Sequence, residues 1–267
     1  MFCKEPGRGG FFARARNGKE GSLRFFGGVY RDQGERERNE DSLSLSILKA
    51  GRKRIVFAVV ADGIGSLAEG DAAGGFVCEG LRKHLYREVI PMVNQRKSFI
   101  RIRNGILGTL YSLNGELGKY GERKGIRLGT TVSLLLIIGR RYLVVNAGDS
   151  AVFRITGKRG ENARITPADR NPDGSINRCI GSFPFRYPFV KTGSCIGEVT
   201  FLVASDGFYR KADHRNALFS PQNLSGPSSC VKRLKESGKL VKKRGETDNA
   251  SAVLVSTGKR FRVFEGR

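Results

Sequence analysis

The strongest constraint on the fold of this chain is a set of short apolar runs that each meet an aspartate. Such runs are typical of buried β-strands, which carry their charged residues at the rim of the sheet. Carboxylates gathered on one rim repel each other by roughly 4 kcal/mol per pair at 4 Å and an effective dielectric of 20. A fold that brings them together needs a counter-charge, and hard cations with oxygen ligands are the usual one. The runs are residues 55–61 before Asp62, 142–148 before Asp149, 201–205 before Asp206 and, in mirror image, 249–255 after Asp248.

Length, composition and cysteine usage predict a globular cytoplasmic protein. The 267 residues include 39% apolar side chains, which is enough for a sizeable core. No apolar stretch approaches the ~18 residues of a membrane span, and residues 1–8 contain no apolar signal-peptide core. The five cysteines show no CxxC pair and no Cys/His zinc spacing, so we expect reduced thiols. We also expect a monomer.

The net charge of +23 is the least usual bulk feature of the chain. It is compatible with attraction to nucleic acid, to an anionic membrane or to acidic proteins, and a solvated basic surface is the simpler interpretation. The basic residues gather in turns and do not interleave with aromatic residues, as a platform for single-stranded nucleic acid would. Nucleic-acid binding through the basic N-terminal residues therefore stays open as an alternative function.

Periodicity predicts groups of antiparallel strands with helices between them, which is the α+β class. Residues 71–90, 97–119 and 228–243 each place apolar side chains on one face, as amphipathic helices do. Residues 165–198 hold four of the eight prolines and little regular pattern, which predicts a long loop or flap. The expected strands are residues 23–30, 42–48, 55–61, 131–138, 142–147, 151–156, 200–205 and 250–256.

No internal repeat or linker divides the chain, so we expect a single domain over residues 22–257. Residues 1–21 are rich in glycine and arginine, and we expect them to form a disordered basic tail. Residues 258–267 then form a short C-terminal tail.

Turn positions predict which residues meet at the rim. Folding about the turn at residues 50–53 places Asp41 opposite Asp62, with Glu40 beside the pair. Gly63 directly follows Asp62, and a glycine there lets the backbone turn sharply and lets its carbonyl approach an ion. The first hairpin thus predicts an acidic cluster.

The remaining aspartates are expected to join this cluster. Folding about residues 139–141 brings Thr131 opposite Asp149. Asp206 ends one strand and Asp248 begins another, so the two share a rim if these strands are antiparallel neighbours. One acidic site is therefore favoured over four unrelated strand-end turns.

The order and spacing of these motifs resemble the metal-dependent serine/threonine protein phosphatases of type 2C, the PPM family, in their compact bacterial form. The resemblance spans residues 34–255 and therefore most of the chain. The segments that carry it are Arg36-Glu37-Arg38-Asn39-Glu40-Asp41, Ala61-Asp62-Gly63-Ile64-Gly65, Gly129-Thr130-Thr131, Asn146-Ala147-Gly148-Asp149-Ser150, Ala204-Ser205-Asp206-Gly207 and Thr247-Asp248-Asn249.

The resemblance implies a four-layer α-β-β-α sandwich of two mainly antiparallel sheets, with a two-metal centre of Mn²⁺ or Mg²⁺ at one end. By motif position, Asp62 is similar to the carboxylate that bridges both ions. Asp206 and Asp248 are similar to ligands of the first ion. The carbonyl of Gly63 and the Glu40-Asp41 pair correspond to ligands of the second, directly or through water.

Two further residues match functional positions of the family. Asp149 corresponds to a position that some bacterial members use for a third, weaker ion, and Arg36 to the arginine that holds the substrate phosphate. The residues themselves agree with this chemistry, because all-oxygen ligands suit Mg²⁺ or Mn²⁺ better than zinc. Two ions on either side of one water lower its pKa and stabilise in-line displacement at phosphorus. Arg36, Asp62 and Asp206 are the expected catalytic residues.

The implied function is the hydrolysis of phosphoserine and phosphothreonine in phosphorylated proteins by a metal-activated water. The expected partners are these phosphorylated proteins and a serine/threonine kinase whose action the phosphatase reverses. One alternative is a non-catalytic regulatory or phosphoprotein-binding module of the same fold, against which the complete set of carboxylates argues. Ile64 stands where many eukaryotic members carry histidine, so no general acid is assigned. Four basic residues of the 165–198 segment are candidates for steering acidic phosphopeptides, namely Arg170, Arg178, Arg186 and Lys191.

Overall fold

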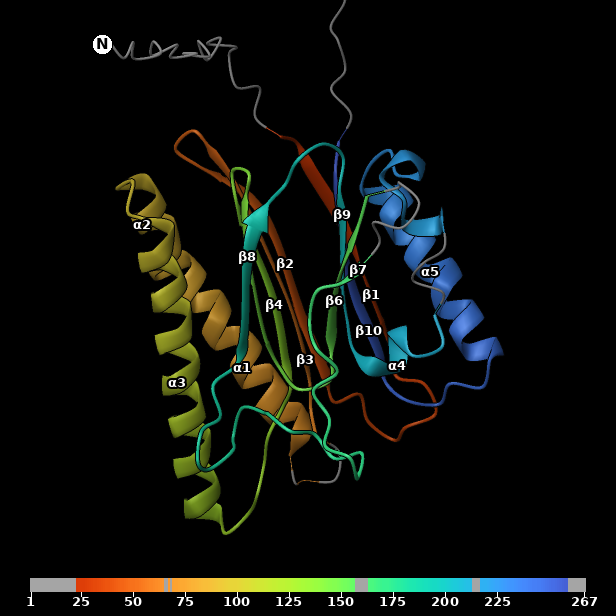
Figure 1. Cartoon of the computed structure of the whole chain (residues 1–267). Coiled ribbons are helices and arrows are strands. Elements are labelled where there is room, and N and C mark those ends of the chain that lie inside the picture. The colour runs from red at the N-terminus through yellow and green to blue at the C-terminus, as the bar shows by residue number, and fades with distance from the viewer. Residues whose placement is uncertain (1–22, 65–66, 68, 157–162, 213–216, 259–267) are drawn as a thin grey trace, which may run out of the picture.

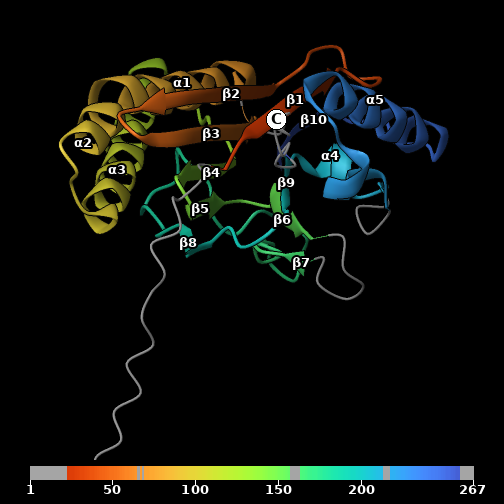
Figure 2. The same cartoon turned by 90° about the horizontal axis from the view of Figure 1, so that it is seen from above.

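The computed structural model describes residues 23–64, 67, 69–156, 163–212 and 217–258. These residues form two five-stranded sheets packed face to face, with helices on both outer faces (Figures 1 and 2). One sheet has the order β1-β10-β9-β6-β7 and the other β2-β3-β4-β5-β8, and every pairing is antiparallel. The expected α-β-β-α sandwich is therefore confirmed. The strands are β1 Phe25–Asp32, β2 Asp41–Ala50, β3 Lys53–Asp62, β4 Val132–Ile138, β5 Arg141–Ala147, β6 Ala151–Ile155, β7 Ala163–Arg164, β8 Phe189–Ser194, β9 Thr200–Ala204 and β10 Ala250–Thr257.

The helices divide between the two outer faces of the sandwich. Helices α1 and α3 cover the sheet that contains β2 and β3, and α5 covers β1 and β10 on the opposite side (Figure 2). The first expected helix continues beyond residue 90, through a π-helical turn at Leu85–Val89 into α2. The helices are α1 Gly70–His84, α2 Ile90–Asn94, α3 Phe99–Lys124, α4 Asp206–Tyr209 and α5 Pro227–Lys243, with 3₁₀ turns at Ala217–Phe219 and Pro221–Asn223.

Three apolar layers hold the sandwich together. Alternate residues of β3 point to opposite faces, so Phe57 packs towards α1 and α3 while Val56 packs between the sheets. On the other side, Leu254 of β10 packs against α5 and Val255 packs between the sheets. Strands β3 and β10 are therefore buried on both faces, which explains why their sequences read as continuous apolar runs.

The segment predicted as a long loop contains one further strand. Residues 165–198 include β8, which pairs with β5 at the edge of its sheet. The prediction missed this strand because most of its side chains are partly or fully exposed, so no buried face imposes an apolar pattern. The 3₁₀ turns and the single-turn helix α4 were also not predicted, because they are too short to show a helical period.

The strand registers decide which residues reach the end of the sandwich. Asp41 pairs with Asp62 across β2 and β3, as the first turn predicted. The second hairpin differs by one residue, because β4 and β5 are joined by Gly139 and Arg140 alone. Val132 pairs with Ala147, so Thr131 lies against Gly148 instead of opposite Asp149.

The domain boundaries at residues 21 and 257 stay predictions. The expected N-terminal tail lies outside the described residues, as does the C-terminal segment after Gly258. Among the described residues, no helix combines the length and the apolarity that crossing a bilayer requires.

A buried amide attaches the segment before β8 to α3. Asn114 is 2% exposed, and its Oδ1 accepts hydrogen bonds from the backbone N–H groups of Gly181 at 2.7 Å and Ser182 at 3.1 Å. Its Nδ2 donates to the carbonyl of Ser182 at 3.1 Å. Ile180 also forms a β-bridge with Thr130, one residue before Thr131. The irregular segment is therefore fixed beside the strands that carry the acidic residues.

We expect Asn114→Ala to lower the free energy of unfolding by about 2 kcal/mol, because it leaves backbone groups of Gly181 and Ser182 without partners. Asn104→Ala, on the exposed side of the same helix, should change stability by less than about 0.5 kcal/mol. Urea unfolding followed by circular dichroism measures both. Equal stability of the two variants would contradict the role given to Asn114.

Candidate metal centre

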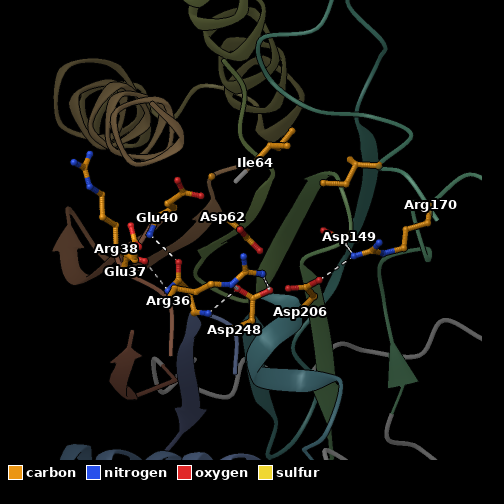
Figure 3. Close-up of a pocket in the computed structure, with 13 residues that line it drawn as sticks. Arg36, Glu37, Arg38, Glu40, Asp62, Ile64, Asp149, Arg170, Asp206 and Asp248 are labelled. Atoms are coloured by element: carbon orange, nitrogen blue, oxygen red, sulfur yellow. Dashed lines mark hydrogen bonds and ion pairs between the residues drawn. The ribbon is translucent and has the colours of Figure 1, made fainter. Parts of the chain in front are cut away.

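The predicted acidic residues gather in an open pocket of about 420 Å³ at one end of the sandwich, where β3 ends and α4 begins (Figure 3). The antiparallel pairing explains this position, because β2 starts and β3 ends at the rim where β9 ends and β10 starts. Asp41 lies behind the pocket and is fully buried. The lining includes the other predicted site residues, namely Arg36, Glu40, Asp62, Gly63, Asp149, Asp206 and Asp248.

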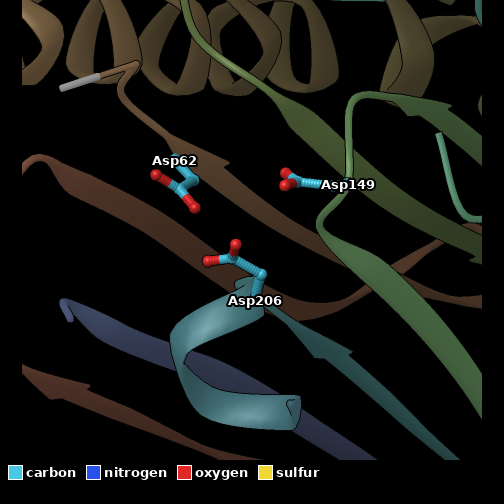
Figure 4. A group of neighbouring side chains, drawn as sticks. All are labelled: Asp62, Asp149 and Asp206. Carbon is cyan, nitrogen blue, oxygen red and sulfur yellow. The ribbon is translucent and has the colours of Figure 1, made fainter. Parts of the chain in front are cut away.

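Three carboxylates converge on one point of this pocket. Asp62, Asp149 and Asp206 each offer an oxygen, and these oxygens lie within 4.8 Å of one another (Figure 4). They come from the end of β3, from the connection between β5 and β6, and from the first residue of α4. The sandwich thus brings together residues that are far apart in the sequence.

Threonine side chains fix the backbone that carries Asp62. The N–H of Asp62 donates to Oγ1 of Thr131 at 3.1 Å, and Oγ1 of Thr130 donates to the carbonyl of Asp62 at 2.9 Å. Oγ1 of Thr131 is also 2.8 Å from Oγ of Ser150, which follows Asp149. The two threonines therefore set the position of Asp62 relative to Asp149.

Gly63 is required by a close backbone approach. A Cβ atom at this position would lie 2.4 Å from the carbonyl oxygen of Gly70, at the start of α1. The N–H of Gly63 donates to the carbonyl of Glu40 at 3.2 Å. From the sequence we expected a glycine here because it allows a sharp turn and lets its carbonyl approach an ion. The structure adds a second reason, because α1 leaves no room for a side chain.

Asp41 joins the two sheets behind the pocket. Its Oδ2 accepts a hydrogen bond from Oγ of Ser205 at 2.9 Å, and its Oδ1 has no hydrogen-bond partner. Oγ of Ser205 in turn accepts from the N–H of Ser251 at 2.9 Å. The carboxylate of one sheet is thereby tied to the strand ends of the other.

Arg36 contacts Asp248 through two nitrogens (Figure 3). Its Nε lies 3.0 Å from Oδ1 and its Nη2 lies 3.0 Å from Oδ2 of the carboxylate. Asn249 holds the surrounding loop, because its Oδ1 accepts from the N–H of Glu40 at 2.8 Å and its Nδ2 donates to the carbonyls of Gln33 and Arg38. The predicted phosphate-binding residue is thus placed beside a predicted metal ligand.

Arg170 reaches into the pocket and contacts two of the converging carboxylates (Figure 3). Its Nη2 forms ion pairs with Oδ2 of Asp149 and, at 2.9 Å, with Oδ2 of Asp206. Arg210 adds an ion pair of 2.7 Å to Oδ2 of Asp206. Neither arginine was predicted to belong to the acidic site.

The other basic residues of the 165–198 segment have different surroundings. Arg178 binds the buried carboxylate of Asp169, at 2.9 Å from Nε to both oxygens. Arg186 donates to the carbonyl of Asn177 at 3.1 Å. Lys191, on β8, is exposed and forms no ion pair among the described residues. Arg178 is therefore a structural residue of the segment.

Burial and mutual repulsion raise the pKa values of the clustered carboxylates. Burial, with a smaller contribution from Asp206 and Asp248, raises the pKa of Asp41 to about 6, although the nearby hydroxyl groups of Ser251 and Ser205 lower it. Burial and the neighbouring carboxylates raise the pKa of Asp62 well above its usual range. Burial and the charge of Asp206 raise the pKa of Asp149 as well, and Arg170 offsets part of this rise. The positive side chains around the pocket therefore do not fully balance the negative charge of these carboxylates.

The donor set of this pocket fits a hard divalent cation. All candidate ligands are oxygen atoms, and neither histidine nor cysteine lines the pocket among the described residues. Buried oxygens of Asp41 and Asp149 have no hydrogen-bond partner, although buried polar atoms are normally satisfied. An ion such as Mg²⁺ or Mn²⁺ would supply both the missing contacts and the missing charge.

A comparison with known protein families identifies the family of this chain. The family model described as Protein phosphatase 2C matches residues 31–237. The chain belongs to this family. It is therefore a protein phosphatase of the serine/threonine type, as the motif resemblance predicted.

Curated relatives of this phosphatase are distant in sequence. "Probable protein phosphatase 2C 59" of Oryza sativa subsp. japonica is 25% identical over 94% of this chain and 79% of the relative. "Probable protein phosphatase 2C 71" of Arabidopsis thaliana is 24% identical over 68% of this chain, which spans about half of that relative, or 46% of its length.

Solved structures share the fold of this phosphatase over most of its length. PppA, described as a key regulatory component of T6SS in Pseudomonas aeruginosa, has a TM-score of 0.70 and 23% identity over 88% of this chain and 99% of that one. The catalytic domain of the serine/threonine phosphatase PstP, in complex with two manganese ions, has a TM-score of 0.67 and 22% identity over 89% and 99% of the two chains.

In the metal-free phosphatase, Asp41→Asn should raise stability at neutral pH. The pKa of Asp41 rises from its ordinary 3.8 to about 6 in the folded state, so the folded state binds this proton more tightly than the unfolded chain. Its contribution to folding is fully present below pH 3.8 and is lost as the pH rises through about 6. The change corresponds to at most about 3 kcal/mol.

Thermal unfolding in the presence of a chelator measures this effect. At pH 7.5 Asp41→Asn should melt above the wild type, and the difference should shrink as the pH is lowered towards 4. Asp173→Asn, at an exposed carboxylate outside the pocket, should show no gain at pH 7.5. If the gain in melting temperature of Asp41→Asn instead grew as the pH is lowered, the raised pKa of Asp41 would be contradicted.

Proposed function

We propose that this phosphatase removes phosphate from phosphoserine and phosphothreonine in phosphorylated proteins, at a centre of two Mn²⁺ or Mg²⁺ ions. The observation that carries the proposal is that the predicted carboxylates, Asp62 and Asp206 foremost, gather at one open pocket. The similar structure of PstP, which holds two manganese ions, supports the number of ions. The proteins that it acts on would be products of a serine/threonine kinase.

The proposed ligands follow the motif positions of the family, and all of them except the buried Asp41 line the pocket. Asp62 is the proposed bridge between the ions, with Asp206 and Asp248 on the first ion. The carbonyl of Gly63 and the Glu40-Asp41 pair are proposed for the second, directly or through water. When bound, two such ions lower the pKa of a coordinated water and neutralise charge on the phosphoryl group.

The role proposed for Arg36 is to orient the phosphate. Its contacts with Asp248 use Nε and Nη2, which leaves Nη1 to donate to phosphate oxygens. A planar guanidinium held in this way presents its remaining donors in a fixed direction. Asp248 therefore serves Arg36 as a positioning partner in addition to its proposed place beside the first ion.

Hydrolysis of para-nitrophenyl phosphate and of a phosphothreonine peptide tests the proposal. Activity should require Mn²⁺ or Mg²⁺ and disappear when a chelator is added. It should fall at least about 100-fold in Asp206→Asn, because this substitution removes the negative charge of a proposed metal ligand. Glu79→Gln, at an exposed carboxylate of α1 paired with Arg82, is the matched control and should keep full activity. Activity without divalent ions, or full activity in Asp206→Asn, would refute the two-metal proposal.

Arg36→Ala should raise KM for the phosphopeptide about tenfold or more, because a charge-assisted contact with phosphate is lost. Arg52→Ala is its control, since Arg52 lies in the β2–β3 turn at the opposite end of the sandwich. Initial rates at varied peptide concentration separate KM from kcat. Identical kinetics for Arg36→Ala and the wild type would remove Arg36 from substrate binding.

A further inference from the structure

The guanidinium of Arg170 lies between two carboxylates that could otherwise share a cation. One of its nitrogens, Nη2, contacts both Oδ2 of Asp149 and Oδ2 of Asp206. Arg210 approaches the same two oxygens, with Nη2 at 2.7 Å from Asp206 and 4.0 Å from Asp149. Two positive side chains thus converge where the two carboxylates face each other.

The backbone next to Arg170 is anchored to the backbone next to Asp149. Asp169 is 2% exposed, and its Oδ2 accepts a hydrogen bond from the N–H of Gly148 at 2.9 Å. The same carboxylate binds Nε of Arg178. Arg170 therefore starts from a point that is fixed relative to the residue before Asp149, and its reach into the pocket follows from the fold.

A local turn holds the side chain of Arg170 as well. Residues 170 and 176 form an antiparallel β-bridge, and the N–H of Asn171 donates to the carbonyl of Ser175 at 2.8 Å. Nη1 of Arg170 donates to the carbonyl of Gly174 at 2.6 Å, inside this turn. Nη1 of the guanidinium thus binds the turn formed by residues 170–176, and Nη2 binds the two carboxylates.

Charge favours a limited number of ions in this pocket. The six predicted acidic ligands face three arginines in ion-pair contact, Arg36, Arg170 and Arg210, which leaves a formal charge of −3. Two divalent ions would bring the site to +1 and a third to +3. Without Arg170 and Arg210 the carboxylates and Arg36 together would carry −5, and three ions would then give +1. The six ligands are Glu40, Asp41, Asp62, Asp149, Asp206 and Asp248.

Asp149 nevertheless keeps the properties of a cation ligand. Its side chain is 3% exposed, and its Oδ1 has no hydrogen-bond partner. We propose that Arg170, supported by Arg210, is a permanent cation of this site and takes the place between Asp149 and Asp206 that a third divalent ion would otherwise fill. The inference rests on the proposed two-ion centre and replaces the third ion that the motif resemblance suggested.

Counting bound Mn²⁺ tests the proposal without measuring activity. Isothermal titration calorimetry and Mn²⁺ electron paramagnetic resonance on the full chain should give two ions for the wild type. Arg170→Ala should bind a third ion, or bind it at least tenfold more tightly than the wild type does. Arg170→Lys keeps the charge and should stay at two, as should Arg186→Ala, which removes a guanidinium of the same segment that faces Asn177.

A second variant covers the case in which Arg170→Ala does not fold. Asp149→Asn should still bind two Mn²⁺ ions, each with an affinity within about threefold of the wild-type value, because Asp149 faces a guanidinium and not an ion. Three ions in the wild type, a reduced count in Asp149→Asn, or two ions with unchanged affinity in folded Arg170→Ala would each overturn the role of Arg170. These three results leave the two-ion function standing, whereas a wild type that binds no Mn²⁺ overturns both.

Discussion

Repulsion among carboxylates at one end of the sandwich is the constraint on which the site depends. The antiparallel order of the two sheets places Asp41 and Asp62 at the same end as Asp206 and Asp248, and the connection between β5 and β6 adds Asp149. Apolar packing of three core layers holds the strands in this arrangement against the repulsion. The stability of the fold thus sustains a concentration of negative charge that an isolated set of loops would disperse.

The chain counters part of this charge with arginines from separate segments. Arg36 follows β1 and contacts Asp248, whereas Arg170, before β8, and Arg210, directly after α4, both contact Asp149 and Asp206. Neutral side chains complete the arrangement, because Thr131 and Ser205 hold carboxylate-bearing segments without adding charge. The remaining negative charge is what makes the pocket suitable for divalent ions.

Local sequence patterns predicted the parts of the site that short turns determine. The turn at Gly51 and Arg52 fixed the pairing of Asp41 with Asp62, because the apolar runs on both sides allow only one register. The β4–β5 hairpin was predicted one residue out of register, because the apolar runs there do not show whether two or three residues form the turn. Its observed turn has Gly139 at φ 63°, which is typical of a two-residue connection.

Contacts between distant segments were not predictable in the same way. Arg170 meets Asp149 and Asp206 across a stretch without helical or strand periodicity, so no spacing rule connects them. Ser205 and Asn249 did carry a signal, since each is adjacent in sequence to a predicted ligand and completes its motif. Their bonding partners, however, depend on how the two sheets face each other, and the sequence pattern of single strands contains no information on that.

The hydrogen bond between Ser205 and Asp41 makes the pocket sensitive to the spacing of the sheets. Asp41 belongs to one sheet and Ser205 to the other, and the apolar layer between them sets how far apart they lie. A change of side-chain volume in that layer, for example at Phe201, would therefore alter the geometry of the acidic cluster without touching it. Affinity for the proposed divalent ions would in this sense be a property of the interior packing, and substitutions at buried positions away from the pocket would change it.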